Sequence, residues 1–375
     1  MPHTTALAPT AARDLYIGLM TGTSLDGVDA VLVDFTDATP RLLGAHALPL
    51  SGGLRAQLLT LQAAAADELH QAYLAGNALA RCYADAVAQL LAQSGFAPAE
   101  IRAIGNHGQT VRHRPECGYT VQLGNHALLA ELTGISVVGD FRSRDVAAGG
   151  QGAPLVPAFH QAIFGRNGEA CVIANIGGIA NITVLDGTGK VAGFDTGPGN
   201  VLMDSWVQQH QGQPYDANGA WAASGQVLPD LLDHWLAEPY FALAPPKSTG
   251  RDLFHAHWLQ RSLSDHHYAP QDVQATLCAL TARTLADAIS QYAPDSRAVY
   301  VCGGGAHNAT LLRALAARLP GARIDTTAAL GVDADWVEAY AFAWLAWCCL
   351  NGRVANLPAV TGARGGRVLG AIYPG

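Results

Sequence analysis

Small, hydroxyl and acidic residues are concentrated between two apolar runs near the start of the chain. The runs Leu15–Met20 and Ala30–Phe35 have the length and composition of strands. Backbone N–H groups and hydroxyls in such a turn can bind an anion, and its carboxylates can hold a hydrated cation. The segment lacks GxxxxGK[ST], so it is not a Walker loop; the alternative is an ordinary hairpin with a polar tip. The residues between the runs that could do this chemistry are Gly22, Thr23, Ser24, Asp26, Gly27 and Asp29.

Two later glycine turns follow the same design. The apolar run 171–174 leads to Asn175, Gly177 and Gly178 and returns as a strand at 181–185. The two hairpin segments begin at residues 15 and 170, which are 155 residues apart, so they predict a duplicated architecture. A third turn, 303–305, lies between a strand at 298–302 and a helix at 308–319, where free N–H groups can bind phosphate. The three turns together predict a nucleotide held between two halves.

Composition limits the classes of protein to which the chain can belong. Half of its 375 residues are apolar and 14% are charged, which is typical of a globular enzyme of two domains. The net charge of −8 argues against nucleic acid as a partner. Seven cysteines with no CxxC pair indicate free thiols in a reducing compartment. The N-terminal segment is not a signal peptide, and the apolar segment 336–350 is too short to cross a bilayer. We therefore expect a soluble, cytoplasmic protein with no membrane partner.

Alternating helical and strand patterns predict an α/β protein. Helices are expected at 67–94, 127–132, 275–292 and 336–351, and further strands at 101–105, 120–123 and 135–138. The linker Gly149–Pro157 divides a first domain, 1–148, from a second, 149–375, whose C-terminal segment can pack back on the first. The long irregular stretch Pro239–Gly250 is of a length usually found in functional or mobile loops.

Seven separate motifs follow one another along the chain. They are MTGTSLDGVD (20–29), GNHGQT (105–110), GDFRSRDVAAGGQGAPLVP (139–157), NIGGIANIT (175–183), GFDTGPGN (193–200), PPKSTGRD (245–252) and CGGGAHN (302–308). Together they resemble the motifs of the anhydro-N-acetylmuramic acid kinases of bacterial cell-wall recycling. The resemblance extends from Ile17 to about Gly370, and its one small departure is Thr21, where the family pattern leads us to expect Ser.

The resemblance implies both a fold and a reaction. The fold is that of the sugar kinase, actin and heat-shock chaperone ATPase superfamily, with two ribonuclease-H-like lobes and a nucleotide cleft between them. The reaction converts 1,6-anhydro-N-acetylmuramic acid, ATP and water to N-acetylmuramic acid 6-phosphate and ADP. ATP and Mg²⁺ are the implied cofactors, and the partner is a small-molecule anhydrosugar. We also expect a homodimer.

Opening the anhydro bridge requires a water activated opposite the leaving O6, as in an inverting glycosidase. Asp195, which follows a predicted strand and opens a glycine-rich turn before a helix at 201–207, is our candidate for the general base. The alternative is that Asp195 caps this helix. Asp26 is our candidate for holding Mg²⁺ through water, while Asp29 is expected to tie the hairpin together.

The remaining site residues follow from matching positions in the resemblance. Arg142 could bind the lactyl carboxylate of muramic acid, although the charged run 140–145 could also be a solvated turn. His107 is a structural residue or a sugar contact, and Glu338 is a helix-terminal carboxylate or a sugar contact. The expected ATP-binding residues are Gly22, Thr23, Ser24, Leu25, Asp26, Gly27, Val28, Asp29, Gly177, Gly178, Gly303, Gly304 and Gly305. The expected substrate-binding residues are His107, Asp140, Arg142, Gly197, Pro198, Asn200 and Glu338.

Two other classes of protein would share these loops. A nucleotide-switched chaperone or filament protein leaves the carboxylate in FDTGPGN unexplained, and a chaperone would also need a substrate-binding domain. An ordinary sugar kinase that phosphorylates a free hydroxyl would need the same loops. Isotopic labelling of the product from water separates it from a bridge-opening kinase.

Overall fold

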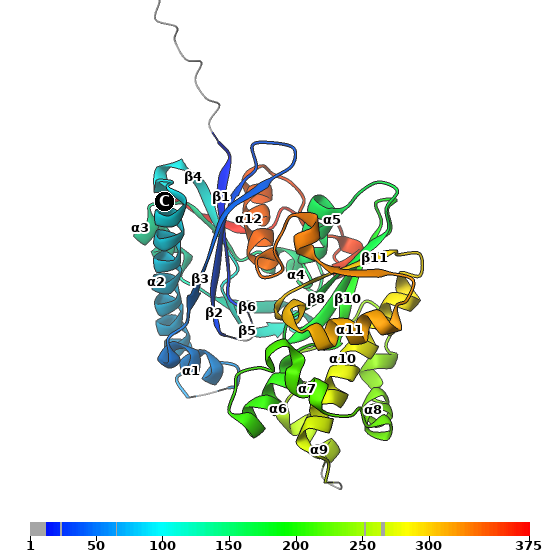
Figure 1. Cartoon of the computed structure of the whole chain (residues 1–375). Coiled ribbons are helices and arrows are strands. Elements are labelled where there is room, and N and C mark those ends of the chain that lie inside the picture. Colours follow the sequence, from blue (N-terminus) through cyan, green and yellow to red (C-terminus); the bar gives the residue numbers. More distant parts are fainter. Residues whose placement is uncertain (1–12, 23–24, 65, 251–252, 264–266) are drawn as a thin grey trace, which may run out of the picture.

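Two mixed β-sheets covered by helices make up the chain in the computed structural model, which describes residues 13–22, 25–64, 66–250, 253–263 and 267–375 (Figure 1). In the first sheet, the strand order is β13-β7-β4-β1-β2-β3. Strands β1, β2 and β3 are antiparallel, whereas β4 and β7 run parallel to β1. These strands are β1 (Leu15–Met20), β2 (Gly27–Asp34), β3 (Arg41–Pro49), β4 (Ile101–Asn106), β7 (Val137–Gly139) and β13 (Ala371–Tyr373).

The second sheet repeats this topology. Its order is β10-β9-β8-β11-β12, with β8, β9 and β10 antiparallel and β11 and β12 parallel to β8. The two-lobed, duplicated α/β fold expected from the paired hairpins is therefore confirmed. The strands are β8 (Cys171–Ile176), β9 (Ile179–Leu185), β10 (Val191–Pro198), β11 (Ala298–Cys302) and β12 (Arg323–Thr326). A separate hairpin is formed by β5 (Gln109–Arg114) and β6 (Tyr119–Leu123).

Alternate residues of β1 point to different helices, as the two-residue period of a strand requires. Leu15, Ile17 and Leu19 belong to an apolar cluster with α2, whereas Tyr16 belongs to the larger cluster that contains the α12 side chains. Figure 1 shows α2 along the outside of the first sheet and α12 on the side that faces the second. The first sheet is thus a buried layer between α2 and a helix from the C-terminal part of the chain.

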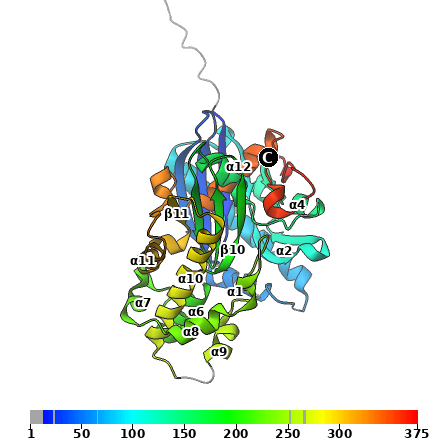
Figure 2. The same cartoon turned by 90° about the vertical axis from the view of Figure 1, so that its right-hand side faces the viewer.

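Helices α6 to α10 lie together at one end of the molecule (Figures 1 and 2). Helix α10 packs against β9 and β10 as well as against α6, α7, α8 and α11, so it joins this group to the second sheet. The helices are α1 (Gly52–Thr60), α2 (Glu68–Ser94), α3 (His126–Thr133), α4 (Ser143–Ala147), α5 (Val156–Phe164), α6 (Val201–Gln211), α7 (Ala220–Ser224), α8 (Pro229–Leu236), α9 (Ala256–Leu263), α10 (Pro270–Tyr292), α11 (Ala309–Arg318), α12 (Val337–Leu350) and α13 (Pro358–Thr361).

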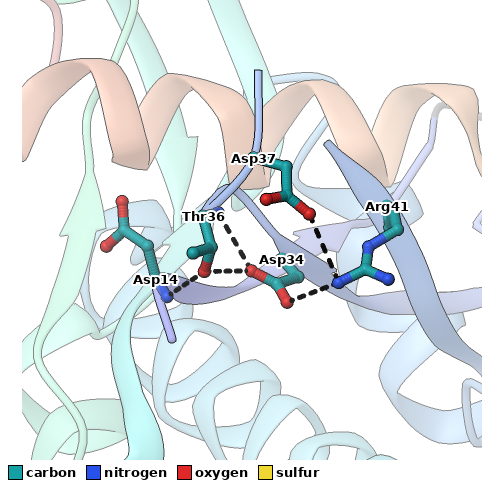
Figure 3. A network of polar contacts seen from close by, with 5 residues as sticks. All are labelled: Asp14, Asp34, Thr36, Asp37 and Arg41. Carbon is teal, nitrogen blue, oxygen red and sulfur yellow. Dashed lines mark hydrogen bonds and ion pairs between the residues drawn. The ribbon is translucent and has the colours of Figure 1, made fainter. Parts of the chain in front are cut away.

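A polar network ties the three antiparallel strands together at the end of the sheet away from the first hairpin turn (Figure 3). Asp34, only 2% exposed, accepts hydrogen bonds from the backbone N–H and the hydroxyl of Thr36. Thr36 in turn accepts from the backbone N–H of Asp14, and Arg41 lies 3.5 Å from both Asp34 and Asp37. These bonds hold the start of β1 against the β2–β3 connection.

Most of the long elements expected from sequence are confirmed. Helix α2 ends at Gly95, whose φ of 75° is the left-handed cap that glycine favours. The sequence does not predict strands β3, β5, β12 and β13. The expected linker Gly149–Pro157 is irregular from residue 149 to residue 155, and α5 begins at Val156.

Candidate active site

Asp195 lies inside β10, not after it. The pairing of β10 with β9 shifts register between Asp195 and Gly197, so the carboxylate lies at a β-bulge. Its Oδ2 accepts a hydrogen bond from the backbone N–H of Thr249 at 3.0 Å. Helix α6 begins after Asn200, beyond the strand. The alternative that Asp195 caps this helix is therefore wrong.

The irregular stretch before residue 251 also forms hydrogen bonds with the backbone of Asp195. The Tyr240 hydroxyl donates to the Asp195 carbonyl at 2.7 Å, and the Asp195 N–H donates to the Lys247 carbonyl at 3.3 Å. The buried hydroxyl of Thr249 has no partner among the described residues. Sequence reasoning assigned no role to Thr249 or Tyr240, although the length of this loop and its PPKSTG motif gave a signal.

Burial raises the pKa of Asp195 to about 6, with the Thr249 hydrogen bond and the positive charge of Arg142 acting in the opposite direction. A carboxyl with this pKa is largely ionised at neutral pH but is a stronger base than an exposed aspartate. It can therefore take a proton from water.

Arg142 is the cation that the acidic residues of this region share. It directly precedes α4, and its Nη1 donates to the Gly152 carbonyl at 2.8 Å. Burial lowers the pKa of Arg142, and the carboxylates of Glu338, Asp195 and Asp145 act against that shift. Among the described residues no ion pair within 4 Å joins Arg142 to a carboxylate.

The other acidic residues of the charged run 140–145 have different surroundings. Asp140 is exposed, has a left-handed backbone with φ of 53°, and accepts from the Ser143 hydroxyl. Asp145 is fully buried and accepts from the side chains of Asn356 and Thr361. The run is therefore not simply a solvated turn, because Asp145 ties α4 to the C-terminal segment.

Glu338, in the first turn of α12, connects the two sheets. Asn175, in β8, donates from its side-chain amide to the Glu338 carboxylate at 3.4 Å. Burial raises the pKa of Glu338, while Arg142 and Asn175 act to lower it. Asp29, in β2, has its pKa raised to about 7, first by burial and then by the negative charge of Glu338. Glu338 therefore interacts electrostatically both with Asp29 of the first hairpin and with Arg142.

In the first hairpin, Leu25 has a positive φ of 58° and donates its N–H to the Gly22 carbonyl. Thr23 and Ser24 lie outside the described residues. A Cβ at Gly27 would come within 2.8 Å of the Leu48 carbonyl, so strand β3 already requires glycine there. Val28 is buried in β2.

The two acidic residues of this hairpin differ in their surroundings. Asp26 is 71% exposed and pairs with Arg55 at 3.6 Å. Asp29 pairs through its backbone with Met20 of β1, and the negative charge of Asp26 is one of the causes that raise its pKa. The expected tie by Asp29 across the hairpin stays a prediction.

The hydroxyl of Thr21 anchors the first hairpin to α2. It lies 2.8 Å from the Tyr83 hydroxyl, and both residues are at most 1% exposed. The bond explains why a hydroxyl is kept where the resemblance led us to expect Ser.

We predict that Tyr83→Phe lowers the free energy of unfolding by about 1–3 kcal/mol, because the Thr21 hydroxyl is left buried without a partner. Urea denaturation measures the change. Adding Thr21→Val, which removes the second hydroxyl at nearly constant shape, should recover part of the loss. Equal and additive losses in the two single variants would contradict this interpretation.

The second hairpin turn is hydrogen-bonded to the segment that follows β10. The Gly178 carbonyl accepts from the N–H groups of Gly199 and Val201, and the Gly177 carbonyl accepts from that of Asn200. The Asn200 side chain donates to the Ile176 carbonyl at 3.1 Å. In the turn and loop bonds of the described backbone, Gly177 and Gly178 act only as acceptors. The segment 199–201 therefore holds the second hairpin turn in place through three backbone hydrogen bonds.

The two residues just before the segment 199–201 are packed into the second sheet. Gly197 has φ of 149°, and a Cβ there would meet the Phe241 ring at 2.6 Å. The Pro198 carbonyl accepts from the Thr281 hydroxyl of α10 at 3.0 Å. Packing against Phe241 and the hydrogen bond from Thr281 therefore give Gly197 and Pro198 a structural role.

In the third turn, only the central glycine has open space. A Cβ at Gly303 would lie 2.5 Å from the Asn175 side chain, and one at Gly305 would lie 2.4 Å from Ile176. The nearest atom to a Cβ at Gly304 is the Asn200 amide nitrogen, at 3.7 Å. The third turn therefore packs on the end of β8, next to the second hairpin.

Neither a cluster of metal ligands nor a membrane-spanning helix is found among the described residues. Among them, no three His, Cys, Asp or Glu side chains are grouped as direct ligands of a metal ion. No helix they form has both the length and the apolar composition needed to cross a bilayer.

Comparison with known proteins identifies the family. A sequence profile described as anhydro-N-acetylmuramic acid kinase matches residues 14–375. The chain belongs to this family. An anhydro-N-acetylmuramic acid kinase from Nitrosomonas europaea is 57% identical over 361 residues, which are 96% of this chain and 99% of that protein. Another, from Bordetella pertussis, is 59% identical over 364 residues, which are 96% of each chain.

The family expected from the seven motifs is thus confirmed. A solved structure, the activator of the 2-hydroxyisocaproyl-CoA dehydratase from Clostridium difficile with bound ADPNP, is similar at a TM-score of 0.47 and 12% identity. That similarity covers 88% of this chain and 92% of the other. Within the anhydro-N-acetylmuramic acid kinase family, the residues described above are the candidate active site.

Proposed function

We propose that the chain is an ATP-dependent kinase that hydrolytically opens 1,6-anhydro-N-acetylmuramic acid and phosphorylates O6. The products are N-acetylmuramic acid 6-phosphate and ADP, in the recycling of peptidoglycan. Family membership supports the enzyme class and the substrate. The observation that carries the reaction is the Asp195 carboxylate, held by Thr249 and with its pKa raised to about 6.

In this reaction Asp195 acts as the general base. It takes one proton from a water molecule whose oxygen bonds to C1 of the sugar. The C1–O6 bond breaks, and O6 leaves with the electron pair of that bond. O6 then bonds to the γ-phosphorus of ATP, and the bond from that phosphorus to the ADP oxygen breaks.

Arg142 is proposed to bind the lactyl carboxylate, because an arginine fork matches a carboxylate with two parallel hydrogen bonds. Arg142 interacts electrostatically with both Asp195 and Glu338, so a sugar bound to it would lie near the base. The remaining proposed substrate-binding residues are Asp140, Gly197, Pro198, Asn200 and Glu338.

ATP is proposed to lie against the three glycine turns, whose N–H groups would bind its phosphates. Mg²⁺ usually takes one or two carboxylates together with substrate phosphates, and Asp26 with Asp29 supplies a set of this kind. Asp26 would hold the ion through water, with Asp29 beside it. When bound, Mg²⁺ neutralises charge that develops on the transferring phosphoryl group.

Cytoplasmic location and a homodimer complete the proposal. Peptidoglycan fragments and ATP would meet in the cytoplasm. Sedimentation equilibrium of the purified chain tests the homodimer.

Product labelling separates this proposal from an ordinary sugar kinase. In ¹⁸O-labelled water, bridge opening should place one label on C1 of the product and none in the new phosphate ester. Mass spectrometry of the product locates the label. Unlabelled N-acetylmuramic acid 6-phosphate incubated in the same water corrects for exchange at C1. Product without label above this control, or phosphorylation of free N-acetylmuramic acid at an equal rate, would overturn the proposal.

A further inference from the structure

His107 is a buried histidine whose ring is in contact with Arg142. It follows β4, its backbone N–H donates to the Leu19 carbonyl of β1, and it is 5% exposed. Its Nε2 lies 3.2 Å from Nε and 3.0 Å from Nη2 of Arg142. The centre of the ring is 4.7 Å from that of Phe342 in α12. Strand, helix and arginine together fix the imidazole.

The contacts of His107 determine its protonation. A guanidinium only donates hydrogen bonds, so Nε2 must offer its lone pair and the ring proton must lie on Nδ1. Burial holds the pKa of His107 well below its usual range, and the charge of Arg142 lowers it further. The Nδ1 atom has no hydrogen-bond partner among the described residues. The ring is therefore a neutral acceptor.

The same contacts determine what Arg142 can still do. Of its five N–H groups, the one on Nε and one on Nη2 point to His107, and one on Nη1 donates to the Gly152 carbonyl. Two N–H groups, one on each terminal nitrogen, are left for a ligand. Because two points on different segments hold the guanidinium, its plane is set before a ligand arrives.

We propose that His107 is a positioning residue that aims the Arg142 guanidinium at a carboxylate of the substrate. It acts through Arg142 and does not itself contact the sugar, which differs from the sugar contact considered from sequence. The proposal depends on the proposed function in one respect, namely that Arg142 binds the anionic sugar. A 5% exposed ring with its Nε2 already engaged is suited to this role.

Two variants of His107 test the role. His107→Phe keeps an aromatic ring against Phe342 but removes the acceptor, whereas His107→Gln keeps an acceptor oxygen near the position of Nε2. We expect His107→Phe to raise KM for the anhydrosugar about 10- to 100-fold, as for loss of a hydrogen bond to a charged group. KM for ATP should change less than about 3-fold. His107→Gln should recover most of the loss, and the acid limb of kcat/KM should not move in either folded variant.

A double-variant cycle distinguishes the possible failures. If His107 acts through Arg142, His107→Phe should cost little more in an Arg142→Lys background than Arg142→Lys alone. Independent, additive losses, or an equal loss in His107→Gln and His107→Phe, would overturn the positioning role. An Arg142→Lys variant with unchanged KM for the anhydrosugar would instead overturn the proposed function of Arg142. Thermal unfolding of each variant checks that it is folded. If His107→Phe does not fold, the same double-variant cycle is measured with His107→Gln and Arg142→Lys, and additive losses there would overturn the positioning role.

Discussion

Replacing Asp195 by Asn is expected to lower kcat by about 10²–10⁴-fold while leaving ATP affinity nearly unchanged. Asn keeps an oxygen that can accept from the Thr249 N–H, so the loop before residue 251 should remain in place. The change removes the proton acceptor for the attacking water. Steady-state kinetics and calorimetric titration with ATP measure the two effects.

The matched control is Asp230→Asn, an exposed aspartate in the first turn of α8, which should retain normal kcat. Asp195→Asn should also be at least as stable as the unchanged protein at pH 7.5, because a raised carboxyl pKa means that the ionised form costs folding free energy. A folded Asp195→Asn variant with more than about a tenth of the normal kcat would show that another group is the base.

The pH dependence of kcat/KM follows from the same carboxyl. The base must be ionised, and its pKa is raised to about 6, so activity should fall as the pH drops through about 6. Asp29, with a pKa raised to about 7, could give a similar limb. Asp29→Asn separates the two: the limb remains near pH 6 if it belongs to Asp195 and disappears if it belongs to Asp29.

Local patterns in the sequence were sufficient to predict the repeated hairpins and the long helices. Each hairpin consists of two strands joined by a turn, so the residues that form it are neighbours in the chain. Helix α2 has its own period and its own glycine cap, and α10 and α12 likewise carry long apolar patterns. The equal topology of the two sheets follows from the repeat.

What could not be predicted depends on contacts between distant parts of the chain. Strand β3 has mixed exposure and forms by pairing with β2, and its own residues do not show a clean alternation. Asp195 appeared to follow a strand because the bulge at Gly197 interrupts the pattern while the pairing continues to Pro198. The Thr249 bond spans 54 residues, and the Asp145 bond to Asn356 spans 211. No local period encodes such bonds.

The glycines also show that contacts between distant segments cannot be predicted from local sequence. We expected the glycine turns to be open for phosphate, yet Gly303 and Gly305 are required by packing on β8. The sequence assigns no packing role to Gly18 or Gly105, although glycine within a strand often marks a place where another backbone approaches closely. In the structure these two glycines are where α12 crosses the first sheet.

Gly18→Ala is expected to lower the free energy of unfolding by about 3 kcal/mol or more, or to prevent folding. A Cβ at Gly18 would lie 1.9 Å from the Ala339 carbonyl, and one at Gly105 would lie 1.9 Å from the Phe342 carbonyl. Both clashes are with the backbone of α12, which no side-chain rotation can relieve.

Because Glu338 lies in the first turn of α12, a shift of this helix would also move the carboxylate that accepts from Asn175 and interacts electrostatically with Arg142. A Gly18→Ala variant that still folds should therefore lose kcat/KM as well as stability. Gly44→Ala is the matched control in the same sheet, since its Cβ would only make ordinary contacts of 3.4 Å with Leu90 and 3.5 Å with Ser94. It should be neutral or slightly stabilising. Urea denaturation of both variants decides: equal unfolding free energies would mean that α12 does not approach β1 as closely as the structure shows.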